Sequence, residues 1–251
     1  MPDLVRSYLK EVSSRLERLA AEAEAGALDA AVELMVEAIG AGGVVQVFGT
    51  GHSEAFAMEI AGRAGGLIPT NKIALRDVVL RGSRDAGALK GSTLERDPAV
   101  IEELLDVSPV AAPDVFIIAS NSGVNGSVVG LALLVKSRGH KLIAVTSLEH
   151  TAAVEAKHPS GVRLSEVADI VIDNMAPFGD TTLELAGGAG VGAVSSITAA
   201  FIAQLLTIGA AERIRAGGTT PPIYISANIP GGDEHNRALE DLYQNRIRRD
   251  A

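Results

Sequence analysis

Three pairs of hydroxyl-bearing residues follow apolar runs that are typical of buried strands. Each pair comes directly after one run: Thr50 and Ser53 after 44–48, Ser120 and Ser122 after 114–119, and Thr146 and Ser147 after 142–145. The carboxyl ends of parallel strands share one edge of a sheet, which is where ligands bind. Hydroxyl groups donate to phosphate oxygens without adding a buried charge. The sequence therefore predicts one phosphate-binding crevice built from three distant segments.

The first of these turns, Gly49-Thr50-Gly51-His52-Ser53, joins a strand to a helix. Such a junction presents free backbone N–H groups to an anion. No Gly-Lys-Ser/Thr follows, so the turn is not a nucleotide P-loop. Glu54 stands where a dinucleotide fingerprint has its third glycine. We therefore expect a small phosphorylated molecule as the ligand.

Three residues are candidates for proton transfer, a step that needs a carboxylate or an imidazole. Glu59 lies on the helix after the glycine turn, His52 lies in the turn, and His235 has acidic neighbours in the segment GGDEHN. Each has a purely structural alternative: Glu59 could face another helix, His52 could make only structural hydrogen bonds, and His235 could lie in a surface turn.

Composition limits the partners that we expect. The formal net charge is −9 and the sequence pI about 5.1, which argues against nucleic acid as a partner. There is no cysteine, and no histidine pair has metal-ligand spacing, so we expect no metal and no cofactor. The N-terminus lacks a signal-peptide pattern, and no apolar run approaches the ~20 residues of a membrane span. We expect a cytoplasmic protein.

Hydrophobic periodicity predicts one α/β domain over residues 41–251, preceded by helices within 1–40 that pack on the core or on a partner subunit. The segment 114–145 is typical of a parallel βαβ unit. A further strand is expected at 168–172 and a long apolar helix at 193–211. Residues 70–98 show little periodicity and are expected to form an irregular insertion, which in compact domains is usually functional.

The motifs VFGTGHS at 47–53, IIASNSGVN at 117–125 and AVTS at 144–147 resemble the SIS (sugar isomerase) phosphosugar-binding family. LER at 94–96, HPSG at 158–161, ADIVIDN at 168–174 and SANIPGGDEHN at 226–236 resemble an uncharacterised bacterial subgroup of that family. The resemblance implies a three-layer α-β-α sandwich with a mainly five-stranded parallel sheet and an N-terminal helical extension. It also implies a homodimer or homotetramer with sites near subunit interfaces.

Carried over to this sequence, the family pattern implies that Ser120, Asn121, Ser122 and Asn125 hold a sugar phosphate. Thr50 and Ser53 would then meet the sugar or the phosphate. Asn125 stands where the family usually has threonine, and its amide can still donate a hydrogen bond.

Two kinds of function remain open from the sequence. The first is an enzyme acting on a hexose or amino-sugar 6-phosphate, either by aldose–ketose isomerisation through C2 proton abstraction or as a C–O lyase on an N-acetylamino-sugar 6-phosphate. The second is a non-catalytic phosphosugar sensor or adaptor. Both enzyme reactions begin with the same proton abstraction, so the residues do not distinguish them.

Overall fold

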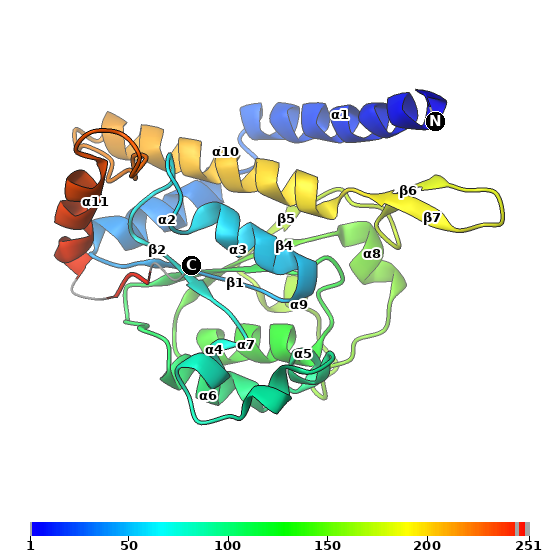
Figure 1. Ribbon diagram of the computed structural model, residues 1–251, viewed down its shortest axis with the longest axis horizontal. Coiled ribbons are helices and arrows are strands. Elements are labelled where there is room, and N and C mark those ends of the chain that lie inside the picture. Colours follow the sequence, from blue (N-terminus) through cyan, green and yellow to red (C-terminus); the bar gives the residue numbers. More distant parts are fainter. Residues whose placement is uncertain (1, 244–245, 249–251) are drawn as a thin grey trace.

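A parallel sheet of five strands forms the centre of the computed structural model, which describes residues 2–243 and 246–248 (Figure 1). In spatial order the strands are β2 (Thr70–Ile73), β1 (Val45–Gly49), β3 (Val115–Ala119), β4 (Lys141–Thr146) and β5 (Ile170–Asp173). All four pairings are parallel. Every residue of β1 and β3 is buried, as expected for strands that helices cover on both faces.

Helices form a layer on each face of this sheet, which confirms the predicted three-layer α/β architecture. One layer contains α2 (Asp29–Gly40), α3 (Glu54–Ile60) and α10 (Ser195–Ala216), with α1 (Pro2–Glu24) against α10. The other contains α4 (Asp77–Leu80), α5 (Thr93–Arg96), α6 (Val100–Asp106), α7 (Gly126–Ser137) and α9 (Leu164–Val167). The remaining short helices are η1 (Gly51–Ser53), η2 (Ala86–Leu89), α8 (Leu148–Ala153), α11 (Gly232–Glu240) and η3 (Asp241–Tyr243).

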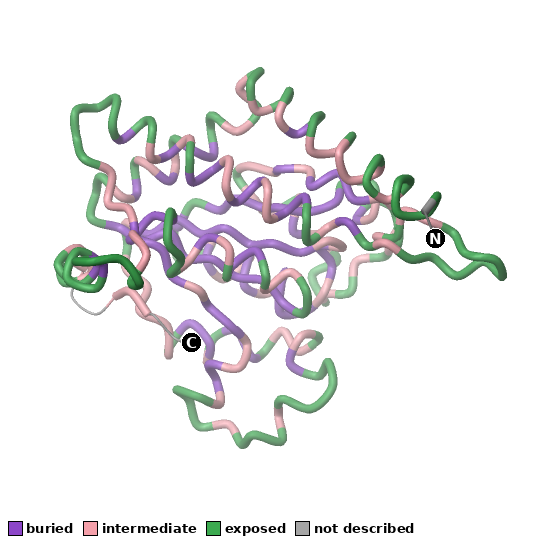
Figure 2. The backbone as a smooth tube through the Cα atoms, turned by 45° about the horizontal axis from the view of Figure 1, so that its top comes forward, coloured by how far each residue is buried: buried purple, intermediate pink, exposed green. Residues whose placement is uncertain are grey.

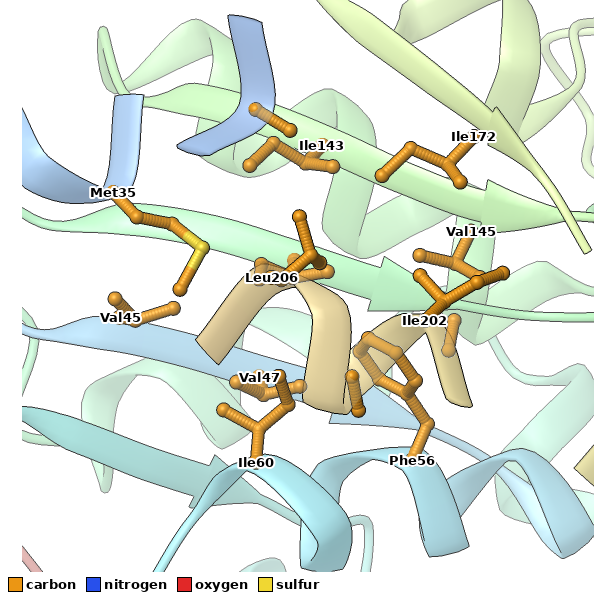
Figure 3. Close-up of a cluster of buried hydrophobic side chains, with 14 of the residues drawn as sticks. Met35, Val45, Val47, Phe56, Ile60, Ile143, Val145, Ile172, Ile202 and Leu206 are labelled. Carbon is orange, nitrogen blue, oxygen red and sulfur yellow. The ribbon is translucent and has the colours of Figure 1, made fainter. Parts of the chain in front are cut away.

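The strands alternate their side chains between two hydrophobic clusters, one on each face. Val45 and Val47 point into the cluster made with α2, α3 and α10, where Leu206 fills the centre (Figure 3). Phe48 and Phe116 point into the opposite cluster, made mainly with α6 and α7. Because aromatic residues are few, aliphatic side chains fill most of both clusters.

Helix α10 is long and apolar enough to cross a membrane, by length and composition alone, and it is the only such helix among the described residues. Core helices pass the same test. Ile202, Ala203 and Leu206 are fully buried and pack in the cluster on the face of the sheet that α2 and α3 also cover (Figure 3). The helix extends to Ala216, five residues beyond the predicted end.

Two elements differ from the sequence prediction. Strand β2 lies within the segment that was expected to be irregular, and it pairs with β1 from Val45↔Thr70 to Phe48↔Ile73. Its pattern was hidden because the buried Asn71 and the half-buried Lys72 interrupt the apolar run. A hairpin of β6 (Thr181–Glu184) and β7 (Gly190–Ala193) precedes α10. It projects as an exposed arm beside α1 (Figure 2).

The N-terminal edge of the sheet, where the strands begin, is covered by C-terminal segments of the chain. Ile223 pairs with Leu67 just before β2, and Tyr224 exchanges backbone hydrogen bonds with Gly65 and Gly66. Helix α11 therefore lies at this end of the sheet (Figure 1). The C-terminal edge, where the strands end, is left to the turns that the sequence singled out.

Candidate functional site

A small pocket lies at the C-terminal edge of the sheet, with about 10 Å³ open to the centre of a water molecule and about 270 Å³ of non-atom space when the open solvent at its mouth is included. It draws on turns after three adjacent strands, β1, β3 and β4, and on the residue that follows β5. Residues at the N-terminal end of α10 form its remaining wall. Its lining residues are His52, Ser53, Phe56, Ala119, Ser120, Asn121, Val145, Asn174, Ser195, Ser196 and Ala199.

The turn after β1 depends on glycine. A Cβ atom on Gly49 would lie 2.3 Å from the carbonyl oxygen of Ser53, and Gly51 has a φ of 55°. The chain can therefore reverse tightly and start a helix at once. His52 and Ser53 line the pocket from this turn. Neither side chain makes a hydrogen bond within the described part of the chain, so both are available to a ligand.

The loop after β3 is held by its own side chains. Ser120 Oγ accepts a hydrogen bond from the Gly123 N–H at 3.1 Å, and Gly123 has a φ of 65°. Asn121 Oδ1 accepts from Asn174 Nδ2 at 3.1 Å, so the amide N–H groups of Asn121 remain free to donate. Sequence reasoning missed Asn174 as a site residue, although it lies two residues beyond the predicted strand 168–172.

Thr146 and Ser147 lie at the predicted edge but do not line the pocket. Thr146 Oγ1 donates to the Asn121 carbonyl at 3.3 Å. Ser147 Oγ donates to the Ala176 carbonyl at 2.6 Å and accepts from the His150 N–H at 2.9 Å. Both residues are fully buried. Their hydroxyls therefore support the loops that hold Asn121 and Asn174.

Glu95, which the sequence analysis noted only as part of the motif at 94–96 and not as a site residue, lies beside the loop after β3. Glu95 Oε1 accepts hydrogen bonds from Asn125 Nδ2 at 2.6 Å and from Thr50 Oγ1 at 3.1 Å. The Glu95 carbonyl accepts from Ser127 Oγ at 2.8 Å. Thr50 and Asn125 thus meet through Glu95 rather than in the pocket lining. Ser122 lies within the same loop, half-buried and without a side-chain hydrogen bond among the described residues.

A glycine at the start of α7 allows the segment that carries Glu95 to lie close to this helix. A Cβ atom on Gly126, the first residue of α7, would lie 2.2 Å from the Arg96 carbonyl oxygen. The segment that carries Glu95 therefore packs directly on the N-terminus of α7. Strand order alone could not reveal this, because Glu95 follows no strand.

Glu59 and His235 do not reach the pocket of this chain. Glu59 Oε1 accepts from Gln204 Nε2 at 2.6 Å and pairs with Arg63, so its carboxylate faces α10 and the segment just beyond the end of α3. His235 lies on α11, at the N-terminal edge of the sheet, and its Nε2 is 3.0 Å from the Ile223 carbonyl oxygen. Of the three predicted proton-transfer residues, His52 lines the pocket.

The pocket lining offers His52 as its one titratable side chain among the described residues. It contains no Asp, Glu, Lys or Arg side chain among the described residues. Asp180 lies behind it and caps α10: its Oδ1 accepts from the Ser195 N–H at 2.8 Å and its Oδ2 from Ser195 Oγ at 2.7 Å. Lys72 and Arg76 lie farther along the edge and pair with Glu54. An anion in this pocket would therefore rest on hydroxyls, amides and helix N-termini.

No group of three His, Asp or Glu side chains lies close enough to hold a metal ion within residues 2–243 and 246–248. The expectation that the protein uses no metal stays a prediction.

Known proteins share both the sequence pattern and the fold. The SIS domain model matches residues 7–147. A UPF0309 protein of Listeria monocytogenes is 38% identical over 239 residues, which are 95% of each chain. Among solved structures, the c3406 protein of Escherichia coli CFT073 has a TM-score of 0.51 at 17% identity, covering 85% of this chain and 90% of that one.

A phosphoheptose isomerase from Francisella tularensis has a TM-score of 0.52 at 15% identity, covering 84% of this chain and 98% of that one. At these identities the two structures establish the fold. The relative and the matched domain establish descent: this chain belongs to the SIS domain family, within the UPF0309 group.

Proposed function

We propose that this protein is a phosphosugar isomerase that converts a hexose or amino-sugar 6-phosphate between its aldose and ketose forms. The observation that supports this most is the pocket at the C-terminal edge, where His52, Ser53, Ser120 and Asn121 meet. Free hydroxyls and amides at helix N-termini suit a phosphate. The carboxylate of Glu95, on the segment beside the loop after β3, suits proton transfer.

In this proposal the loop from Ser120 to Asn125 holds the phosphate, and the glycine turn holds the sugar. Ser53, Ser122 and the Asn121 amide donate to phosphate oxygens. Thr50 and Asn125 position Glu95 beside the bound sugar. Thr146 and Ser147 keep the loops in place. The phosphate charge is balanced by backbone N–H groups and by the N-terminal ends of α3 and α7.

Glu95 acts as the base. In an open-chain hexose 6-phosphate it removes the C2 proton, the C–H electron pair forms an enediolate, and return of the proton to C1 with the C2 oxygen becoming the carbonyl gives the ketose; with a 2-amino sugar the same step gives a C2 imine, which water must hydrolyse with release of ammonia. His52 moves the second proton between O1 and O2. Glu59 is the weaker candidate because Gln204 and Arg63 already hold its carboxylate.

The reaction can be tested with a panel of sugar 6-phosphates in D₂O, followed by proton NMR. An isomerase gives the ketose with deuterium at the carbon that accepts the proton. Loss of the C3 substituent would make the protein a lyase. Measurable binding without exchange for any sugar would make it a sensor or adaptor, and either result overturns the isomerase proposal.

Glu95→Gln and Glu59→Gln form a matched pair for the base. We expect Glu95→Gln to lower turnover by about 10²–10⁴-fold, the usual contribution of a general base, with sugar-phosphate binding retained. Glu59→Gln should leave turnover nearly unchanged. The reverse pattern would assign the base to Glu59, as the sequence suggested.

We also propose that the chain assembles as a homodimer or homotetramer with sites near subunit interfaces. Support comes from exposed apolar side chains on the projecting half of α1, namely Leu4, Val5 and Leu9, next to the hairpin residue Val191. Neighbouring exposed apolar residues are typical of interaction surfaces. Leu9→Glu should shift the mass measured by light scattering to that of one chain, while Lys10→Glu should not.

A further inference from the structure

The segment 174–180 joins β5 to the hairpin that precedes α10, and both of its ends touch the pocket lining. Asn174, at its start, lines the pocket and donates to Asn121. Asp180, at its end, accepts hydrogen bonds from the N–H and hydroxyl groups of Ser195 and so caps α10, whose first residues form one wall. The position of this segment therefore sets the position of two parts of the pocket lining.

The backbone of this segment is strained near both ends. Met175 has a φ of 57° and Asp180 a φ of 67°, values that residues other than glycine rarely adopt. Such conformations persist only where the surrounding structure holds them. The segment therefore depends on its contacts with neighbouring elements.

Helix α8 supplies contacts to the middle of the segment. Glu149 Oε1 accepts from the Phe178 N–H at 2.9 Å, and His150 Nδ1 accepts from the Gly179 N–H at 3.0 Å. The His150 ring also stacks on Phe178, with the ring centroids 5.3 Å apart. Because Nδ1 is an acceptor here, the neutral imidazole carries its proton on Nε2. A protonated imidazole has an N–H on both nitrogens and can no longer accept the Gly179 N–H.

Charged side chains lie on each element packed around His150. They are Glu149 on the same helix, Asp173 at the end of β5, Asp180 on the segment itself and Arg163 on the loop before α9. The three carboxylates accept from backbone N–H groups, and Arg163 donates to two carbonyl oxygens at the end of α8. Carboxylates and guanidinium groups ordinarily keep their charge between about pH 8 and pH 5.5, whereas imidazoles change theirs. In that range, His150 is the group that alters the contacts of this segment.

We propose that His150 is a positioning residue for the phosphosugar site, a proposal that rests on the proposed function above. The neutral imidazole holds the segment 174–180 by accepting the Gly179 N–H, which keeps Asn174 and the start of α10 in place. Protonation replaces the acceptor with a second N–H donor, which repels the Gly179 N–H. Stacking on Phe178 can retain the ring, since a cation is attracted to an aromatic face, but it does not replace the lost backbone hydrogen bond. The site therefore binds at neutral pH and loosens in acid.

Hydrogen exchange of the free protein, followed by mass spectrometry of a peptide that contains Gly179, tests the contact without a ligand. In the wild type, we expect protection relative to the unstructured exchange rate to fall at least about fivefold from about pH 8 to pH 5.5, the effect of one lost hydrogen bond. His150→Asn should keep its protection at both pH values, because asparagine Oδ1 takes the position of Nδ1 and does not titrate. His150→Ala should lack that protection at both. His158→Asn, in an exposed turn where the imidazole contacts Ser160, is the control and should behave as the wild type.

Calorimetric titration of the same four proteins with glucose 6-phosphate connects the segment to the pocket. Acid weakens phosphate binding in every variant, because a phosphate monoester gains a proton near about pH 6, so the variants are compared at one pH. At about pH 5.5 we expect His150→Asn to bind at least about threefold tighter than the wild type. At about pH 8 the two affinities should agree within about twofold, with His150→Ala weaker than both.

A fall in protection that is as large in His150→Asn as in the wild type, or no fall in the wild type, would overturn the proposal. Equal affinities of the wild type and His150→Asn at the lower pH, with protection lost in the wild type alone, would overturn the link between His150 and the pocket. Absence of binding in all four proteins at both pH values would count against the phosphosugar function, and the exchange result would then decide the role of His150 alone.

Discussion

The two edges of the sheet differ in how far their polar side chains are hydrogen-bonded within the protein. At the C-terminal edge, the side chains of His52, Ser53 and Ser122 make no hydrogen bond within the described part of the chain. At the N-terminal edge, Asp114 is 3% exposed and is bonded on every side. It accepts from the Val44 N–H at 2.9 Å, from Gln46 Nε2 at 2.9 Å and from the Ala111 N–H at 3.0 Å.

The network at the N-terminal edge extends across the strands. Arg246 pairs with Asp114, and Gln46 Oε1 accepts from Asn71 Nδ2 at 3.0 Å. A buried carboxylate is tolerated only when charge and hydrogen bonds compensate it. This difference indicates which edge can bind a ligand. The bonded polar groups of the N-terminal edge stabilise the fold, whereas the unbonded side chains of the C-terminal edge can bind a ligand.

Asp114→Ala should produce the largest effect, because it leaves Arg246 and several buried donors unpaired. We expect a loss of about 3–5 kcal/mol in the free energy of unfolding, measured by urea denaturation. Sugar-phosphate affinity of the folded fraction should not change. Asp106→Ala, an exposed residue in a long ion pair with Arg138, serves as the control and should lose less than about 0.5 kcal/mol. A similarly small loss in Asp114→Ala would mean that this edge does not stabilise the fold.

Gly126→Ala tests the C-terminal edge by displacing the segment that carries Glu95. The new Cβ atom would meet the Arg96 carbonyl, and overpacking of this kind costs about 1–3 kcal/mol. Turnover should fall with it. In Gly130→Ala, on the same helix, the nearest atom to the new Cβ is 3.4 Å away, so helix propensity should make this variant neutral or slightly stabilising. Unchanged turnover in Gly126→Ala would separate Glu95 from the chemistry.

Ser122→Ala should weaken sugar-phosphate binding by about 1–2 kcal/mol, the cost of one charge-assisted hydrogen bond, with stability almost unchanged. Ser137→Ala, at the far end of α7, is the control for calorimetric titration. Equal affinity of wild type and Ser122→Ala would remove Ser122 from the phosphate loop.

Acid should weaken the N-terminal edge through Asp169, which lies just before β5. Burial raises the pKa of Asp169, but hydrogen bonds from Lys136 at 2.6 Å and from the Leu142 N–H outweigh it, so the pKa lies below its ordinary value. A lowered folded-state pKa contributes stability above the unfolded value of about 3.9, and that stability is lost as pH falls through the folded value.

The contribution of Asp169 is the smallest of the four, up to about 1 kcal/mol, because the pair with Lys136 is partly exposed. Urea denaturation between about pH 2 and pH 6 should show the wild type losing its advantage over Asp169→Asn as the solution is acidified. A constant difference across that range would contradict this assignment.

Sequence reasoning succeeded where local pattern and topology coincide. The apolar runs before Thr50, Ser120 and Thr146 are strands, and parallel pairing brings their ends to one edge. It failed where tertiary packing decides. Periodicity places Glu59 on α3 but does not tell which helix it faces, and Gln204 decides that.

Strand β2 and Glu95 were hidden for a related reason. Asn71 is polar and fully buried because Gln46 on the neighbouring strand bonds it, a compensation that no local pattern shows. Glu95 reaches the site from a short helix, α5, and through a close backbone approach at Gly126.

The ion pair between Arg246 and Asp114 also sets an order of events during synthesis. It joins residues 132 positions apart, and Arg246 also donates to the Gly42 carbonyl, 204 positions away. A nascent chain that has been synthesised as far as Ala199 contains every pocket residue. It still lacks Arg246, the cation that compensates Asp114. The binding edge can thus be assembled while the opposite edge waits for residue 246, and a nascent chain stalled before that residue would carry a buried carboxylate without its counter-ion.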